Sequence, residues 1–212
     1  LNLAGARIAR HAAANKAWVL GDIGPSGDFL EPIGTMTEEE LTKNFVQQAE
    51  AFRDAGADGV IIETMVDPAE LRIAVQSAKR VAPWPVIATF TFKYDPSRGF
   101  HTVMGTHLEE AIQHAIDAGA DMVGANCGTN LDLDDYRMLG EQIVQHAKGH
   151  PTIVQPNAGS PQVVGSELVY NATPDAMGAL ASHLWSVGIR AVGGCCGTGP
   201  SHVRAFAANL PK

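Results

Sequence analysis

The sequence predicts an α/β fold, a (β/α)8 TIM barrel of which about six βα units are visible. Short apolar runs alternate with amphipathic stretches along the chain of 212 residues. A glycine recurs at the joints between a stretch and the run that follows it. The first run starts near Ala17 and the last near Arg190, which gives about 35 residues per unit, as in a barrel.

The apolar runs are short, and most of them suit strands that are buried on both faces of a parallel sheet. In chain order they are Ala17–Gly21, Gly59–Glu63, Pro85–Phe92, Met122–Cys127, Thr152–Pro156 and Ala191–Cys195.

The stretches between the runs read as helices, and a leading helix covers Asn2–Asn15. Their starts carry capping residues: an N-cap hydroxyl or carboxylate with a glutamate three residues on, or with a proline at the first helical position. The predicted caps are Thr37 with Glu40, Asp67 before Pro68, Thr106 with Glu109, and Thr173 before Pro174.

The joints between a helix and the next strand repeat a short pattern. Residues 54–58 and 117–121 both read Asp-Ala-Gly-Ala-Asp, and residues 186–190 are a looser version. We expect Gly56, Gly119 and Gly188 to end their helices in the left-handed conformation.

An eight-unit barrel at this spacing needs roughly 280 residues, so the chain is short by about two units and opens on a helix. Either it forms a six-stranded open sheet, or the first two units of a barrel are missing. We favour the second interpretation, because an open sheet would expose two long edges. We therefore expect one barrel domain over residues 1–212, incomplete at its N-terminal side.

Composition excludes several classes of protein. The net charge of −8 disfavours nucleic acid and anionic membranes as partners. The sequence has no apolar run approaching the roughly 20 residues of a membrane-spanning helix, and its opening does not resemble a signal peptide. Three cysteines, two of them adjacent, are not typical of a secreted disulfide framework. We expect a cytoplasmic enzyme.

All three cysteines fall at the carboxyl ends of predicted strands, where α/β proteins carry their chemistry. They are Cys127, Cys195 and Cys196. Converging thiolates suit Zn²⁺, and three protein ligands leave a fourth position open, as in catalytic sites. Adjacent residues of a strand face opposite ways, so Cys195 and Cys196 can share a metal only if the chain bends there, which the glycines at 193, 194 and 197 would permit.

The three cysteines allow two other interpretations. They could be buried core thiols, because free cysteine is often buried. They could also form a redox pair, although adjacent cysteines fit disulfide geometry poorly.

Five strand-end motifs together resemble the homocysteine S-methyltransferase family. They are Gly-Asp-Ile-Gly-Pro-Ser-Gly (21–27), Ile-Ile-Glu-Thr (61–64), Gly-Ala-Asn-Cys-Gly (124–128), Pro-Asn-Ala-Gly (156–159) and Gly-Gly-Cys-Cys-Gly-Thr (193–198). The family's first-strand Asp-Gly segment has no counterpart in this sequence.

The resemblance implies a zinc-dependent methyltransferase that moves a methyl group to the homocysteine thiolate and forms methionine. It implies that Cys127, Cys195 and Cys196 bind zinc and act in catalysis through it. It also implies substrate-binding roles, for Glu63 at the amino group, for Asn157 and Ala158 near the amino-acid end, and for Asn126 beside Cys127. The implied partners are homocysteine and a small methyl donor, or a separate corrinoid or folate module.

Two other functions remain open from the residues. One is a phosphate-binding barrel aldolase or isomerase, with residues 193–199 cradling phosphate and Lys93 near a strand end. The other is a non-catalytic or degenerate barrel that binds zinc for structural reasons. We interpret Asp22 as the cap of a turn with Gly24 and Pro25.

Overall fold

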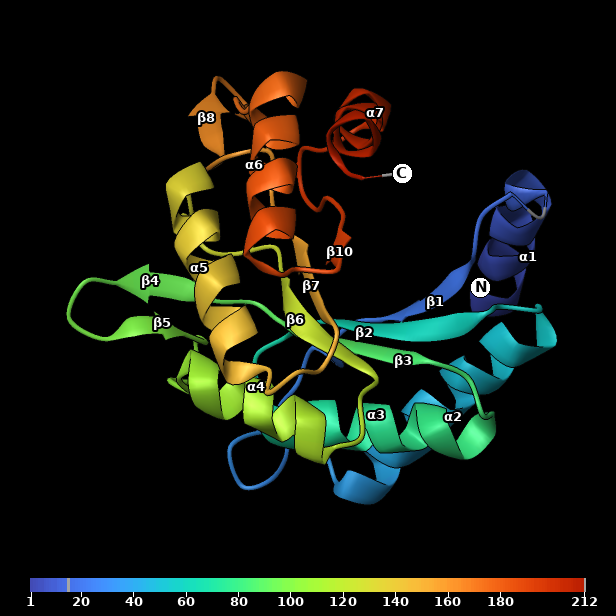
Figure 1. Cartoon of the computed structure of the whole chain (residues 1–212). Coiled ribbons are helices and arrows are strands. Elements are labelled where there is room, and N and C mark those ends of the chain that lie inside the picture. Colours follow the sequence, from blue (N-terminus) through green and yellow to red (C-terminus); the bar gives the residue numbers. More distant parts are fainter. Residues whose placement is uncertain (15, 212) are drawn as a thin grey trace.

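The computed structural model describes residues 1–14 and 16–211. Its main sheet has six parallel strands, which run in chain order across the sheet (Figure 1). They are β1 (Leu20–Ile23), β2 (Gly59–Met65), β3 (Val86–Phe90), β6 (Met122–Asn126), β7 (Thr152–Gln155) and β10 (Ala191–Val192).

The helices follow the strands and pack against one another in the same order. They are α1 (Asn2–Ala13), α2 (Glu38–Asp54), α3 (Pro68–Val81), α4 (Leu108–Asp117), α5 (Leu133–His146), α6 (Pro174–Val187) and α7 (Pro200–Asn209). Figure 1 shows α2, α3 and α4 below the sheet, with α5 and α6 continuing around it where β6 and β7 rise. A curved parallel sheet with neighbouring strands in chain order and an outer layer of helices is the arrangement of a βα barrel. The predicted fold class is confirmed, with six βα units observed.

Within the described residues, β1 pairs only with β2, and β10 pairs only with β7. The sheet is therefore open between β1 and β10. None of the described helices is both long enough and apolar enough to cross a membrane.

The core lies between the sheet and the helices. Valine and isoleucine side chains of the strands, among them Val60, Ile62 and Val86, are fully buried there. Gly124 sets the approach of β6 to β7, because a Cβ atom at this position would lie 1.8 Å from the Ile153 carbonyl oxygen. Close packing of these two strands brings their carboxyl ends, and the loops that follow, side by side.

The local signals give mostly the expected elements. Gly56, Gly119 and Gly188 adopt positive φ angles at the ends of α2, α4 and α6. The helix caps at Thr37, Asp67 and Thr173 form as predicted, and each side chain accepts a backbone N–H. The predicted first helix is observed over Asn2–Ala13, and its predicted last residue, Asn15, lies outside the described residues, as does Lys212 at the end of the predicted domain.

The predicted start of α4 is wrong by one residue. His107, not Thr106, is the N-cap, and its N–H donates to the Glu110 carboxylate. The Thr106 carbonyl oxygen accepts from the N–H of Thr102 at 2.9 Å. Thr106 therefore closes the preceding turn, and the helix begins after it.

The bounds of the first and last strands differ most from the prediction, and those of the other four differ by one or two residues. The first strand runs over Leu20–Ile23 instead of Ala17–Gly21, because the parallel register pairs Leu20 with Gly59 and Asp22 with Ile61. The last strand ends at Val192, where the chain turns into the loop that carries the paired cysteines.

Two hairpins project from the strand ends, and neither was expected from the sequence. One pairs β4 (Lys93–Asp95) with β5 (Gly99–His101), and the other pairs β8 (Gln162–Val164) with β9 (Glu167–Val169). These strands are three residues long, too short to give a readable alternation of apolar and polar residues.

Candidate metal centre and substrate site

The structure brings the three predicted thiols together. Cys127 follows β6, and Cys195 and Cys196 follow β10, on the far side of β7. Their sulfur atoms lie within 4.8 Å of one another, with Cys127 Sγ 4.0 Å and Cys195 Sγ 3.9 Å from Cys196 Sγ. Tetrahedral zinc with Zn–S bonds of about 2.3 Å separates its sulfurs by about 3.8 Å. The donor set therefore fits zinc.

The bend that lets Cys195 and Cys196 face one point is a tight turn. Both the N–H and the hydroxyl of Thr198 donate to the Cys195 carbonyl oxygen, at 3.2 and 2.7 Å. Gly197 has a φ of +76°, and a Cβ atom there would lie 2.2 Å from the ring of Tyr170. The turn therefore needs glycine at this position both for its conformation and for space.

Cys127 lies in a second turn with left-handed backbone. Its φ is +55°, and that of Gly128 is +132°. Left-handed backbone at a residue other than glycine costs about 1–3 kcal/mol and persists only where neighbouring bonds hold it. The Cys127 N–H donates to the Gln155 carbonyl oxygen, and the Tyr136 hydroxyl donates to the Cys127 carbonyl oxygen at 2.6 Å.

The interaction between the thiols shifts their pKa values in opposite directions. A hydrogen bond from the Cys195 thiol lowers the pKa of Cys127 to about 5, against the opposing effect of burial. The same hydrogen bond and burial raise the pKa of Cys195. Cys127 and Cys195 are half-buried and Cys196 is exposed, so the cluster is open on one side.

Asn157 and Ala158 lie on the loop after β7, next to the metal loop. The Asn157 side chain accepts from the Cys196 N–H at 3.1 Å and donates to the Gly128 carbonyl oxygen at 3.2 Å. The Ala158 N–H donates to the Cys196 carbonyl oxygen at 2.9 Å. Both residues are buried, and their polar contacts hold the backbone on either side of the cysteines.

Asn126, the last residue of β6, is buried between two strand ends. Its Oδ1 atom accepts from the Thr64 N–H and from the Thr89 hydroxyl, each at 2.7 Å. Its Nδ2 atom donates to the Thr64 hydroxyl and lies 3.9 Å from Cys195 Sγ. Asn126 thus connects the end of β2 to the cysteine cluster.

Glu63 and Asp22 lie at the same end of the sheet as the cysteines, where the strands reach their carboxyl ends. We call this end of the sheet the mouth. The pKa of Glu63 is raised by burial, and then by the nearby charges of Asp22 and Cys127. Burial also raises the pKa of Asp22. Interpreting Asp22 as a turn cap was wrong, because it lies within β1 and its carboxylate accepts no hydrogen bond within the described residues. A carboxylate inside a short apolar run is a sequence signal that marks Asp22 as a candidate site residue.

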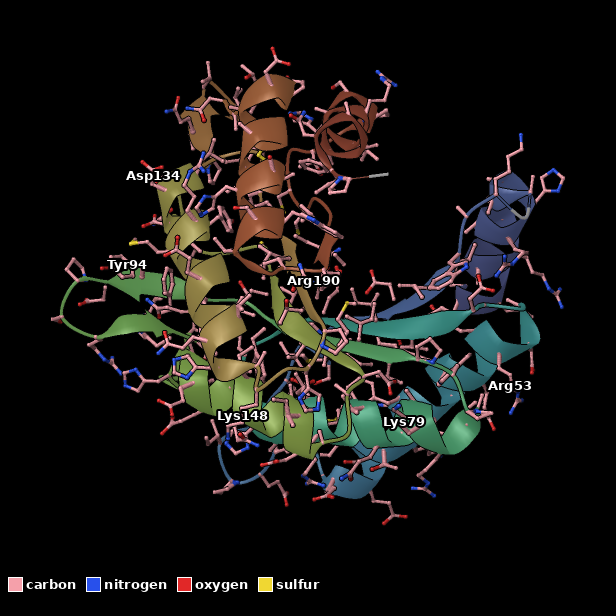
Figure 2. All side chains as sticks on the ribbon, viewed as in Figure 1. Arg53, Lys79, Tyr94, Asp134, Lys148 and Arg190 are labelled. Atoms are coloured by element: carbon pink, nitrogen blue, oxygen red, sulfur yellow. The ribbon has the colours of Figure 1, made fainter. Side chains whose placement is uncertain are left out.

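One ion pair lies at the opposite end of the sheet from the cysteines. Lys79 pairs with Asp121, which precedes β6 and therefore lies at the amino end of the sheet. Figure 2 shows Arg53 and Tyr94 at opposite ends of the view, with Tyr94 on the hairpin that follows the carboxyl end of β3. No salt bridge within the described part of the chain involves Asp22 or Glu63. The carboxylates of Asp22 and Glu63 therefore lie near the Cys127 thiol without an ion-pair partner among the described residues.

The sequence analysis missed Tyr136, which lies in α5 and is fully buried. Its hydroxyl contacts both Cys127 and Asn157, the latter by accepting the Asn157 N–H at 3.2 Å. Nothing in the local sequence separates this tyrosine from an ordinary core residue.

Comparison with known proteins is consistent with this geometry. The family described as Homocysteine S-methyltransferase matches residues 1–210. Methionine synthase from Mycobacterium tuberculosis is 31% identical over 98% of this chain, and betaine–homocysteine S-methyltransferase 1 from Rattus norvegicus is 27% identical over 99% of it. The chain spans 18% of the first relative's length and 53% of the second's.

Among solved structures, the apo form of the homocysteine methyltransferase MmuM from Escherichia coli superposes with a TM-score of 0.70. It is 21% identical, and the match covers 96% of this chain and 69% of that one. This likeness supports the barrel fold. The match to the family extends over almost the whole chain and includes the three cysteines at the strand ends. The chain therefore belongs to the homocysteine S-methyltransferase family.

Proposed function

We propose that this chain binds Zn²⁺ through Cys127, Cys195 and Cys196 and transfers a methyl group to the thiolate of homocysteine, forming methionine. The observation that carries the proposal is the sulfur triad. Its three atoms lie within 4.8 Å of one another, with two pairs at 3.9 and 4.0 Å, close to the spacing in tetrahedral zinc. Its open side would admit a fourth sulfur from the substrate.

Bound zinc would supply one thing, a substrate thiol held deprotonated near neutral pH. Cys127, Cys195 and Cys196 would hold the ion, and their three negative charges, which exceed the charge of the ion, would leave the substrate sulfur electron-rich and nucleophilic. The substrate sulfur would attack the methyl carbon in line. The new S–CH₃ bond forms while the bond from methyl to donor breaks, and its electron pair leaves with the donor.

The chain's other residues would position the substrate. The Glu63 carboxylate, half-buried and without a protein partner in the described residues, would accept the ammonium group of homocysteine. Asn126 would hold the end of β2, and with it Glu63, at a fixed place relative to Cys195. Such positioning converts the reaction into an effectively unimolecular step.

Asn157 and Ala158 are proposed near the amino-acid end of the substrate. Asn157 and Ala158 are only 4% and 1% exposed. The Asn157 side chain and the Ala158 N–H each form a hydrogen bond with the backbone of Cys196. These contacts favour support of the metal loop as their main contribution.

The proposed partners are homocysteine and a methyl donor, either a small molecule or a separate corrinoid or folate module. The relatives' names include both a methionine synthase and a betaine–homocysteine methyltransferase. Three free thiols suit a reducing compartment, and we propose the cytoplasm.

The loop of residues 193–199 argues against a phosphate site. Its N–H groups at Cys195, Cys196 and Gly199 already donate to protein acceptors: the Pro156 carbonyl oxygen, Asn157 Oδ1 and His202 Nδ1. A phosphate cradle needs such groups free to face the anion.

The test is the zinc content of the purified chain, with its sulfur coordination measured by X-ray absorption before and after adding homocysteine. We expect one zinc with three sulfurs, rising to four. Absence of zinc would overturn the metal site. A zinc whose coordination homocysteine does not change, or whose fourth ligand comes from the protein, would instead support a non-catalytic barrel.

A further inference from the structure

We infer that Tyr136 is a positioning residue of the metal centre, which holds the Cys127 turn and the Cys196 turn at the separation that the ion requires. The inference rests on the proposed zinc site and adds a residue to it.

The contacts form an unbroken chain of hydrogen bonds between the two turns. The Tyr136 hydroxyl donates to the Cys127 carbonyl oxygen at 2.6 Å and accepts the Asn157 N–H at 3.2 Å. The Asn157 side chain then donates to the Gly128 carbonyl oxygen and accepts the Cys196 N–H. We call these two residues, Tyr136 and Asn157, the brace.

The brace matters because the turns it joins have no direct strand contact. Cys127 follows β6 and Cys196 follows β10, and β7 lies between them in the sheet. Sheet pairing alone therefore fixes their relative position only through β7. The brace adds side-chain bonds to this pairing. The Asn157 side chain, on the loop after β7, bonds both turns, and Tyr136 fixes the Cys127 carbonyl oxygen against the Asn157 backbone.

The local backbone is shaped to admit the tyrosine hydroxyl. A Cβ atom on Gly128 would lie 3.0 Å from the Tyr136 hydroxyl oxygen and 2.7 Å from a Leu131 side-chain carbon. Gly128 has a φ of +132°, a backbone conformation that residues other than glycine rarely adopt. The turn thus leaves room for the hydroxyl beside the Cys127 carbonyl oxygen, and the hydroxyl in turn stabilises the left-handed backbone of Cys127.

Replacing Tyr136 by phenylalanine removes only the hydroxyl and keeps the ring. We expect Tyr136→Phe to weaken zinc binding by about 10- to 100-fold, the usual effect of losing a partner that orients metal ligands. The measurement is competition with a chromophoric chelator, using zinc alone and no homocysteine, at a temperature well below the melting temperature of each variant. Tyr94→Phe is the matched control, because it deletes the same hydroxyl in the β4–β5 hairpin, where the ring packs on Phe100. Its zinc affinity should equal that of the unmodified chain.

The outcomes separate this inference from the proposed function. If the unmodified chain binds no zinc, the metal site itself is refuted. If it binds zinc and Tyr136→Phe binds it equally tightly, Tyr136 has only a structural role, even where the melting temperature falls, and the inference is overturned. If Tyr136→Phe does not fold, Asn157→Ala removes the side-chain bonds of the brace to the Gly128 carbonyl oxygen and the Cys196 N–H and keeps the backbone N–H that Tyr136 accepts. A loss of zinc affinity in that variant supports the brace, because Tyr136 then no longer reaches the Cys196 turn, and an unchanged affinity overturns it.

Discussion

The two sides of the mouth at the strand ends hold their polar groups in opposite ways. On the cysteine side, at the ends of β6, β7 and β10, each turn is tied to another by hydrogen bonds through Tyr136 and Asn157. On the carboxylate side, at the ends of β1 and β2, Asp22 and Glu63 accept no hydrogen bond within the described residues, and their pKa values are raised.

This difference indicates which kind of ligand each side would bind. Thiolates held at metal spacing before any ion is present need little reorganisation on binding, which favours affinity. Glu63, which is half-buried without a partner among the described residues, is costly to ionise, and a cationic group would relieve that cost. The cysteine side therefore suits the proposed metal, and the carboxylate side suits the ammonium group of the proposed substrate.

The largest effect is expected from removing a ligand on the cysteine side. Cys127→Ala should weaken zinc binding by at least about 100-fold, because zinc sites bind with about 10–16 kcal/mol shared among four ligands. Methyl transfer to homocysteine should be lost with it. Alanine and cysteine both carry a Cβ atom, so the left-handed backbone at this position is no more strained in the variant. Zinc titration by chelator competition measures the loss, and retained activity would refute the role of the thiolate.

The next effect should fall on the other side and leave the metal alone. Glu63→Gln should weaken homocysteine binding to the zinc-loaded chain by about 10- to 100-fold, the value of a hydrogen bond to a charged group. Zinc affinity should stay within about twofold. Isothermal titration with homocysteine gives the first quantity and chelator competition the second. Glu39→Gln, on the exposed face of α2, is the control. Equal losses of zinc and homocysteine affinity in Glu63→Gln would mean that the two sides are not separable.

A residue that joins the two sides should affect both, and by less. Asn126→Ala leaves the Thr64 N–H without its acceptor and removes the Nδ2 atom near Cys195. An unsatisfied buried group costs about 1–3 kcal/mol, so we expect the melting temperature to fall by about 2–10 °C. Homocysteine and zinc affinity should both drop by less than in the variants above. Asn44→Ala, exposed on α2, controls for loss of an amide, and a variant that loses only one of the two affinities would contradict the bridging role.

The sequence predicted the parts of this molecule that depend on local signals. Gly56, Gly119 and Gly188 end helices because a left-handed residue is needed there, whatever the tertiary structure. The positions of the cysteines followed from one further rule, that parallel strands bring their carboxyl ends to the same edge.

The parts that were missed depend on packing between distant segments. Tyr136 is nine residues from Cys127 in sequence. Its contacts with the site depend on the packing of α5 against the loops after β6 and β7, which no local pattern predicts. Asp22 was misplaced because the first strand is set by its register with β2, which lies nearly forty residues away in sequence. Local patterns cannot specify register between separate strands.

The smallest expected effect tests whether the carboxylate side lowers the stability of the metal-free chain. Burial raises the pKa of Glu63 above its ordinary value of 4.5, so the folded chain binds this proton more tightly than the unfolded chain does. Its ionised form therefore lowers stability at neutral pH, and the cost disappears as the pH falls below the ordinary value. Glu63→Gln should raise the melting temperature at pH 7, by no more than about 3 °C because solvent screens a half-exposed group. The gain should shrink as the pH is lowered toward 4. A melting temperature that falls in Glu63→Gln at pH 7 would show that the carboxylate has a stabilising partner in the folded chain, and the contrast between the two sides would then have to be abandoned.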